Sequence, residues 1–139
     1  MLNRAQIRIR VPHAGVMCLL DSVQRWDETT IVCQADAPTT AHPLARAQGV
    51  PAIAAVEYAA QAAAVHGSLL DDSASPRTGM LVKLTDVELS AAALGEAGGP
   101  LRVRAELLSR VESGCMYAFE VSDRNTCAAR GRLLVAFQP

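Results

Sequence analysis

The sequence predicts an α+β domain in which an antiparallel sheet wraps around one long, buried helix. Two observations lead to this fold class. The segment from about Pro51 to Leu70 is apolar on every side, which is typical of a helix that is buried over most of its surface. Most of the remaining chain alternates between apolar and polar residues with a period of two, which indicates strands. A helix of this kind needs a sheet around it to cover its apolar surface.

The first strand is expected near the N-terminus, where Ile7, Ile9 and Val11 alternate with arginines. A second strand is expected at Ile31–Asp36. The helix follows, because Pro51 suits a first helical position and the residues after it have good helix propensity. Gly67 weakens the helix near its end.

Four further strands are predicted after the helix, each separated from the next by a short turn. Turn residues cluster in the segments EAGGP, ESG and DRN, and such short links favour antiparallel hairpins. A wrapped sheet leaves strand edges open, and dimerisation is a common way to cover them. These strands are Leu81–Ser90, Leu101–Val111, Met116–Ser122 and Cys127–Phe137.

Composition narrows the possible functions. The chain has 139 residues, so we expect a single domain over residues 1–139 that needs no disulfide or metal. Its 13 basic and 14 acidic residues give a net charge of -1, which does not indicate a nucleic-acid or membrane-surface protein. The N-terminus lacks the apolar region of a secretory signal, and the alanine-rich helix is a poor membrane span.

The cysteines indicate a reducing environment. Their spacing matches neither a zinc site nor a disulfide framework, so we expect no metal and free thiols in a cytoplasmic protein. These residues are Cys18, Cys33, Cys115 and Cys127.

Glu57 is the most unusual residue of the predicted helix. Burying a carboxylate without a partner costs several kcal/mol or more, so a buried glutamate usually has a role or a pair. Gln61 lies one helical turn further on, where its amide is within reach of the carboxylate. A glutamate that faces a solvated groove is the alternative, and the pattern alone leaves both interpretations open.

The three histidines are His13, His42 and His66. His13 lies in the segment VPHAGVMCLLD, after the first predicted strand. We expect His42, in a loop, and His66, near the helix end, to be ordinary surface or terminal histidines.

His13 and Glu57 together supply the groups that dehydration of a β-hydroxyacyl compound requires. A histidine can remove the α-proton near neutral pH. A carboxyl group in apolar surroundings has a raised pKa, which favours the acid that protonates the departing hydroxyl. Free N–H groups at the helix N-terminus, near Ala52, are suited to polarise a thioester carbonyl.

Two segments resemble a known family. The segment PHAGVMCLLD is similar to the P-H-x-x-x-M-L-L-x-D stretch of 3-hydroxyacyl-[acyl-carrier-protein] dehydratases. The segment GVPAIAAVEYAAQAAA resembles their central-helix motif, in the version that belongs to the aryl polyene branch. The C-terminal GRLLVAFQP also looks like that branch. The resemblance runs through the whole chain in order and in length.

The resemblance implies a hotdog fold, paired into a homodimer by a continuous sheet, and an acyl substrate carried on acyl carrier protein. It also implies that His13 of one subunit faces Glu57 of the other, with His13 as base and Glu57 as acid. Gln61 matches the family glutamine that supports the carboxylate. Ala52 stands where many relatives have the glycine whose backbone N–H binds the thioester carbonyl. No cofactor is implied.

Two other functions remain open. In a hotdog thioesterase, Glu57 would activate water or attack the thioester, although many such enzymes lack the histidine motif. In a non-catalytic hotdog subunit, the chain would only bind acyl groups or pair with an active partner.

For the dehydratase, Arg46, Arg77 and Arg130 are the candidates for contact with an acidic carrier protein.

Overall fold

The computed structural model describes residues 1–11, 17–71, 79–96, 98–124 and 126–137. Two α-helices, a short 3-10 helix and six strands make up the ordered elements of these residues. In chain order they are α1 (Arg4–Arg8), β1 (Ser22–Trp26), β2 (Thr30–Ala35), η2 (Ala52–Ala54), α2 (Ala55–Leu70), β3 (Gly79–Leu89), β4 (Leu101–Val111), β5 (Gly114–Asp123) and β6 (Thr126–Phe137).

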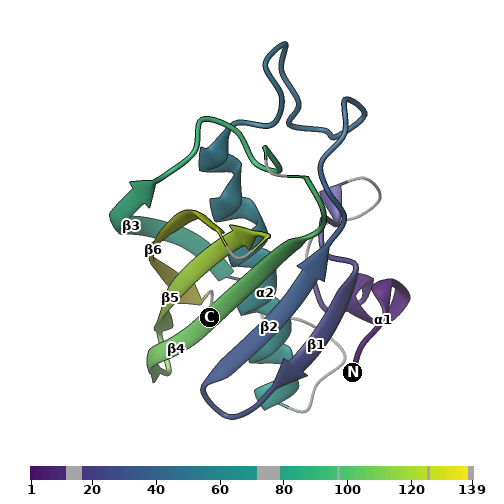
Figure 1. Cartoon of the computed structure of the whole chain (residues 1–139). Helices are drawn as coiled ribbons and strands as arrows, with labels where there is room; N and C mark the ends of the chain where they lie inside the picture. Colours follow the sequence, from purple (N-terminus) through teal and green to yellow (C-terminus); the bar gives the residue numbers. More distant parts are fainter. Residues whose placement is uncertain (12–16, 72–78, 97, 125, 138–139) are drawn as a thin grey trace.

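The six strands form one antiparallel sheet in the order β1-β2-β4-β5-β6-β3. Hairpins join β4 to β5 and β5 to β6, and β3 crosses over to pair with β6 at the edge. Figure 1 shows that the sheet curls around α2, which lies inside the curve. The predicted α+β arrangement of a helix wrapped by an antiparallel sheet, the hotdog fold, is therefore confirmed.

Helix α2 is buried over most of its length. None of its residues is fully exposed, and it packs against β2, β4 and β5. Its many alanines let the backbone approach the sheet closely, while the larger Tyr58 and Val65 fill the remaining space. Among the described residues, no helix is both long enough and apolar enough to cross a membrane.

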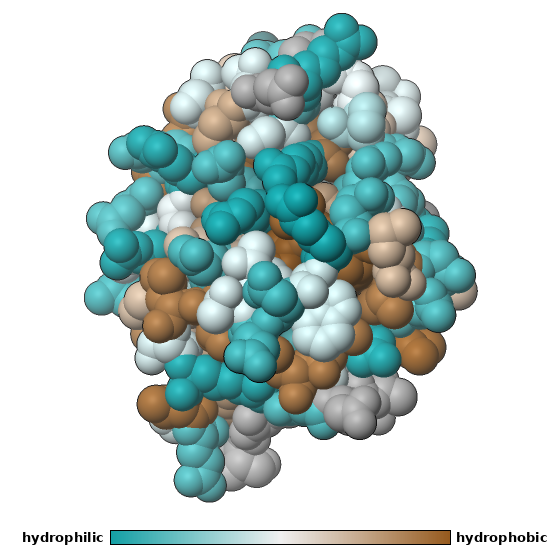
Figure 2. All heavy atoms as spheres, turned by 60° about the horizontal axis from the view of Figure 1, so that its bottom comes forward, coloured by the Kyte–Doolittle hydropathy of each residue, from teal (hydrophilic) through white to brown (hydrophobic). Residues whose placement is uncertain are grey.

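The strands show the alternation that predicted them. In β4, Leu101, Val103 and Ala105 face the core, whereas Arg102 points to solvent. On the outer face, charged residues of opposite sign lie in register across neighbouring strands, which makes this face a balanced, solvated surface. One such row is Arg104, Glu120, Arg130 and Glu88. Figure 2 turns the bottom of Figure 1 forward and shows hydrophobic side chains in small groups between hydrophilic ones.

The strand predicted at Ile7, Ile9 and Val11 is wrong, because this region begins with helix α1. Asn3 caps the helix, since its side chain accepts a hydrogen bond from the Gln6 N–H while the Gln6 side chain accepts one from the Asn3 N–H. Ile7 is buried, but Ile9 is 58% exposed, so the alternating residues do not share one buried face.

Other boundaries are close to the predictions. The β4 limits are those predicted, and β2, β3, β5 and β6 differ by a few residues at their ends. Strand β1 was missed, because Val23 is its only buried residue and the period-two signal is weak. Pro51 precedes the helical region as the cap of η2 rather than opening α2 itself.

Two glycines should respond in opposite ways to alanine. A Cβ at Gly67 in α2 meets nothing within 4 Å, whereas a Cβ at Gly114 in β5 would lie 2.3 Å from the Val135 carbonyl oxygen. We expect Gly67→Ala to raise the free energy of unfolding by roughly 0.5–1 kcal/mol, and Gly114→Ala to lower it. Urea unfolding of both variants checks this, and equal stabilities would contradict the described packing of β5 against β6.

Candidate active site

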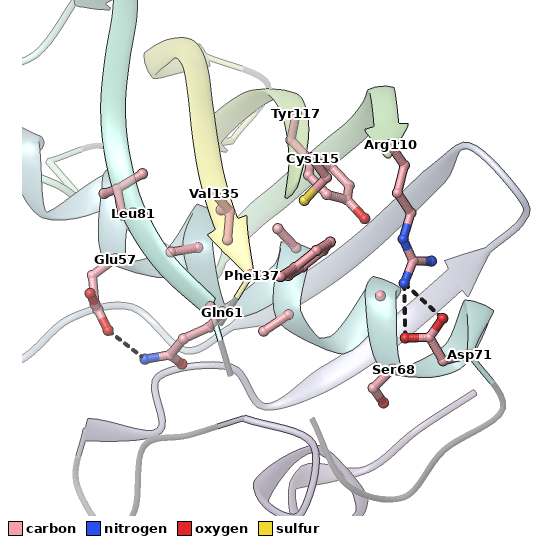
Figure 3. Close-up of a pocket in the computed structure, with 15 residues that line it drawn as sticks. Glu57, Gln61, Ser68, Asp71, Leu81, Arg110, Cys115, Tyr117, Val135 and Phe137 are labelled. Carbon is pink, nitrogen blue, oxygen red and sulfur yellow. Dashed lines mark hydrogen bonds and ion pairs between the residues drawn. The ribbon is translucent and has the colours of Figure 1, made fainter. Parts of the chain in front are cut away.

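A pocket of about 260 Å³ lies between one face of α2 and the inner side of β3, β5 and β6 (Figure 3). Its helix side consists mainly of small residues, including Ala60, Ala64 and Gly67, which leave room beside the helix. Leu81, Val135 and Phe137 form much of the opposite wall. The pocket is therefore mostly apolar, with polar groups at its two ends, as in many small-molecule sites.

Glu57 and Gln61 form one polar end of the pocket. The Gln61 amide nitrogen donates a hydrogen bond to Glu57 Oε1 at 3.2 Å. Glu57 is half-buried, whereas Gln61 is only 1% exposed. The proximity predicted from their spacing of four residues is confirmed, and the carboxylate faces the pocket with one oxygen oriented by a fixed donor.

The orientation of the Gln61 amide is determined by two backbone groups. Gln61 Oε1 accepts a hydrogen bond from the Leu19 N–H at 2.9 Å, and the amide nitrogen donates to the Met17 carbonyl at 2.6 Å. A reversed amide would satisfy neither partner, because a carbonyl cannot donate and an N–H cannot accept. The second amide hydrogen is thus directed at Glu57.

The hydrogen bonds of Gln61 also hold the segment Met17–Asp21, which begins four residues after His13 in the sequence. Gln61 binds Met17 and Leu19, and Arg4 of α1 binds the Cys18 carbonyl at 2.7 Å and forms an ion pair with Asp21. This part of the chain is therefore attached to α2 beside Glu57. His13 itself lies outside the described residues, so its predicted role stays a prediction.

The backbone N–H of Ala52 is already bonded. It donates to the carbonyl of Ala92 at 3.1 Å, and Pro51 pairs with Ala93 beside it. Ala52 is buried as well. The predicted role of this N–H in binding a thioester carbonyl would require the bond to Ala92 to open.

His66 is not an ordinary helix-end histidine, because it is completely buried. Its Nε2 lies 2.8 Å from the backbone carbonyl of Asp27, and its Nδ1 lies 2.7 Å from the hydroxyl of Tyr117. A carbonyl only accepts, so Nε2 carries the ring proton and Nδ1 accepts from Tyr117. Burial lowers the pKa of His66, which keeps the ring neutral.

His42 is also held by specific partners rather than free at the surface. Its Nδ1 accepts a hydrogen bond from the Leu44 N–H at 3.0 Å, and its Nε2 lies 2.9 Å from the hydroxyl of Tyr58. Tyr58 follows Glu57 in α2 and is buried, and burial raises the pKa of its hydroxyl to about 12. The loop that contains His42 is thus attached to the helix one residue from Glu57.

These two histidines should make the stability of the protein depend on pH. Burial lowers the pKa of both below the ordinary value of 6.5, so the unfolded chain binds protons more readily than the folded one. The stability they contribute is present above that value and is lost as the pH falls below it. We expect a smaller free energy of unfolding at about pH 5.5 than at about pH 7.5, measured with urea. His66→Gln and His42→Gln should each weaken this dependence, and an unchanged slope in both would contradict it.

The second polar end of the pocket was not predicted. Arg110 Nη2 lies 2.7 Å and 2.8 Å from the two carboxylate oxygens of Asp71, and the hydroxyl-bearing ring of Tyr117 lines the pocket nearby. In Figure 3 this group lies across the pocket from Glu57. The one sequence signal that could have indicated it is Tyr117, a hydroxyl-bearing residue at an inward-facing position of β5 between apolar neighbours.

Comparison with known families gives one clear match. A family model described as ApeP-like, ApeP dehydratase, matches residues 5–139. This match covers nearly the whole chain and confirms its resemblance to dehydratases of the aryl polyene branch. No curated protein matches the sequence.

Solved structures support the same fold. The chain is similar to the dehydratase heterocomplex ApeI:P from Xenorhabdus doucetiae, with a TM-score of 0.84, 23% identity, and coverage of 100% of this chain and 93% of that chain. A hypothetical thioesterase with coenzyme A from Streptococcus pneumoniae gives a TM-score of 0.65 at 8% identity, with 84% of each chain covered. The E. coli PaaI protein gives 0.63 at 13% identity, with coverage of 83% and 81%.

Proposed function

The chain belongs to the ApeP-like dehydratase family. We propose that it removes water from a 3-hydroxyacyl thioester to give the trans-2-enoyl thioester. In this proposal His13 and Glu57 carry out the reaction, and the substrate is held by acyl carrier protein. The observation that supports the proposal best is the oriented Glu57 carboxylate, which faces a mostly apolar pocket and is bonded to Gln61. We also propose a cytoplasmic location, for which the free thiols of all four cysteines are suitable.

In the proposed reaction, His13 takes the α-proton of the acyl group, and the electron pair of that C–H bond forms the new double bond. The bond between the β-carbon and its hydroxyl breaks at the same time. Glu57, in its acid form, gives a proton to the departing hydroxyl, which leaves as water. His13 is four residues from Met17, whose carbonyl binds Gln61 beside Glu57.

His42 is the other histidine to test as the base. The structure attaches it to Tyr58, but Nδ1 accepts from Leu44, so the ring proton of the neutral histidine lies on Nε2 and faces the tyrosine oxygen. In that arrangement Nε2 has no lone pair to receive a proton from a substrate. This favours His13, and variants of both residues distinguish the two.

The second subunit is proposed to bind along β3. This strand is at the edge of the sheet, and large apolar residues are exposed along it, with Met80 55% and Val82 50% exposed. An open, apolar edge strand favours pairing with another strand. Leu81 and Gly79 of β3 also line the pocket, so a subunit docked here would lie beside Glu57. We propose a homodimer with shared active sites, and the similar ApeI:P heterocomplex makes a second hotdog chain the alternative partner.

The carrier protein would need a basic contact near the pocket. Arg130 is a poor candidate, because Glu88 already binds its guanidinium at 2.7 Å. Arg46 is exposed, and Arg77 lies outside the described residues. Arg46 is therefore the residue to test for carrier binding.

The decisive experiment incubates the purified protein with a 3-hydroxyacyl thioester on acyl carrier protein and identifies the products by mass spectrometry. Loss of water with the thioester intact supports the dehydratase. Release of free carrier thiol without an enoyl product would instead indicate a thioesterase. Binding without turnover would indicate a non-catalytic subunit, and adding a second hotdog chain then tests whether activity needs a heterocomplex.

Light scattering of the purified protein tests the proposed homodimer. A particle mass of twice the 14.7 kDa of one chain supports it.

His13→Ala and His42→Ala, assayed on the same substrate, locate the base. We expect His13→Ala to lose turnover and His42→Ala to retain most of it. The opposite result would transfer the role to His42.

A further inference from the structure

We propose that the hydrogen bond between Arg10 and Ser68 positions His13 for the removal of the α-proton. The inference rests on the proposed function, because it takes His13 as the base. It goes further by assigning a role in the reaction to two residues that need not touch the reacting atoms. Loss of their bond should therefore slow the reaction without weakening the binding of the substrate.

Arg10 reaches α2 from a distant part of the sequence. Its Nη1 donates a hydrogen bond to Ser68 Oγ at 2.6 Å, across 58 positions of the chain. Ser68 is only 2% exposed, and the Nε atom of Arg10 is buried as well. Removing part of a guanidinium from water costs free energy, which a charge-assisted hydrogen bond to a buried hydroxyl offsets. The contact is therefore a specific attachment of the chain to the helix.

The segment that contains His13 is held on α2 at both of its ends. At its start, Arg10 binds Ser68. At its end, the carbonyl of Met17 accepts a hydrogen bond from the Gln61 amide at 2.6 Å. Gln61 and Ser68 are seven residues apart in α2, which is roughly 10.5 Å along the helix axis, and both side chains line the pocket (Figure 3). The rigid helix therefore sets the separation of the two points at which the segment is attached.

Chain length makes the position of His13 depend on these attachments. His13 is the third residue after Arg10 and the fourth before Met17. A chain of three residues spans at most roughly 11 Å, so the position of Arg10 limits the positions that the histidine can reach. Fixing the ends of a short segment also reduces the number of conformations open to it. The bond to Ser68 thus acts on the histidine through the backbone.

Attachment of α1 to the rest of the fold does not by itself require this bond. Ile7 of that helix is completely buried, and Arg4 forms an ion pair with Asp21. Arg10 lies beyond the C-cap of α1, where the chain leaves the helix and continues toward His13. Its contact therefore fixes the exit of the chain from α1 rather than the helix itself.

The test compares kcat and KM for Arg10→Met, Ser68→Ala and the double variant, with a 3-hydroxyacyl thioester on acyl carrier protein. Methionine keeps an apolar stem but has no donor. We expect each single variant to lower kcat per folded enzyme roughly 10–100-fold with little change in KM, because a small misplacement of a reacting group has this effect. The double variant should lose no more than the single variants, since all of them remove the same bond. The matched control is Arg8→Met, at an exposed position of α1, which should keep the wild-type kcat.

Arg10→Lys is the second variant if Arg10→Met fails to fold. It keeps a charged donor and should retain more of the wild-type kcat than methionine does. Hydrogen exchange of the peptide that covers residues 11–17 needs no substrate, and it should be faster in Arg10→Met than in Arg8→Met.

Two results would overturn the inference and leave the proposed function intact. One is an undiminished kcat per folded enzyme in Arg10→Met when His13→Ala loses turnover. The other is a set of additive losses in the double variant, because independent effects would then replace a shared bond. If His13→Ala keeps its turnover, the proposed base and the inference that rests on it are both wrong.

Discussion

Replacing Glu57 by glutamine is expected to lower kcat by roughly 10²–10⁴-fold, the usual contribution of a positioned acid or base. Glutamine keeps the size of the side chain and can still accept a hydrogen bond from Gln61, so the pocket should keep its shape. It cannot give a proton to the departing hydroxyl. Substrate binding should therefore change little, and steady-state kinetics should show the loss in kcat rather than in KM.

The matched control for this variant is Glu106→Gln, which makes the same change on the outer face of β4, away from the pocket. We expect it to keep wild-type turnover. Circular dichroism and the urea midpoint should show that Glu57→Gln remains folded. A Glu57→Gln enzyme with undiminished kcat would remove the proposed acid, whatever the role of His13.

The parts of the fold that could be predicted are those whose signal is local. Helix α2 is recognisable because its residues are mostly apolar on every side, and β4 because buried and more exposed residues alternate along its first half. The pairing of Glu57 with Gln61 also follows from local geometry, since residues four apart share one side of a helix. Each of these inferences needs only the neighbouring sequence.

Helix α1 was missed although its signal is local, because the Asn3 cap outweighs the short alternation that suggested a strand. The other missed features depend on contacts between distant segments. His66 is buried by Tyr117, which lies 51 positions further along the chain, and by the Asp27 carbonyl, 39 positions earlier. The pair of Arg110 with Asp71 likewise joins β4 to the end of α2. No spacing rule connects such residues, so the far end of the pocket emerges only from the three-dimensional fold.

Gln61→Leu is expected to have the largest effect on stability. Leucine nearly matches the volume of glutamine but removes three hydrogen bonds at a residue that is only 1% exposed. The Leu19 N–H and the Met17 carbonyl would lose their partner, and each unpaired buried group costs about 1–3 kcal/mol. We expect the free energy of unfolding, measured with urea, to fall by about 2–4 kcal/mol. The exposed Gln24→Leu is the control and should change stability little.

Activity in this variant distinguishes a structural role from a positioning role. If Gln61 only stabilised the fold, the fraction that remains folded would have the wild-type kcat and KM. Because Gln61 donates to Glu57 Oε1 at 3.2 Å, its loss should leave the carboxyl group without a fixed orientation, so kcat per folded enzyme should fall while KM changes little. Gln61→Glu can still accept from the Leu19 N–H but has no amide donor for Glu57, so it should lower kcat as well. An unchanged kcat per folded enzyme in both variants would limit Gln61 to holding the Met17–Leu19 segment against α2.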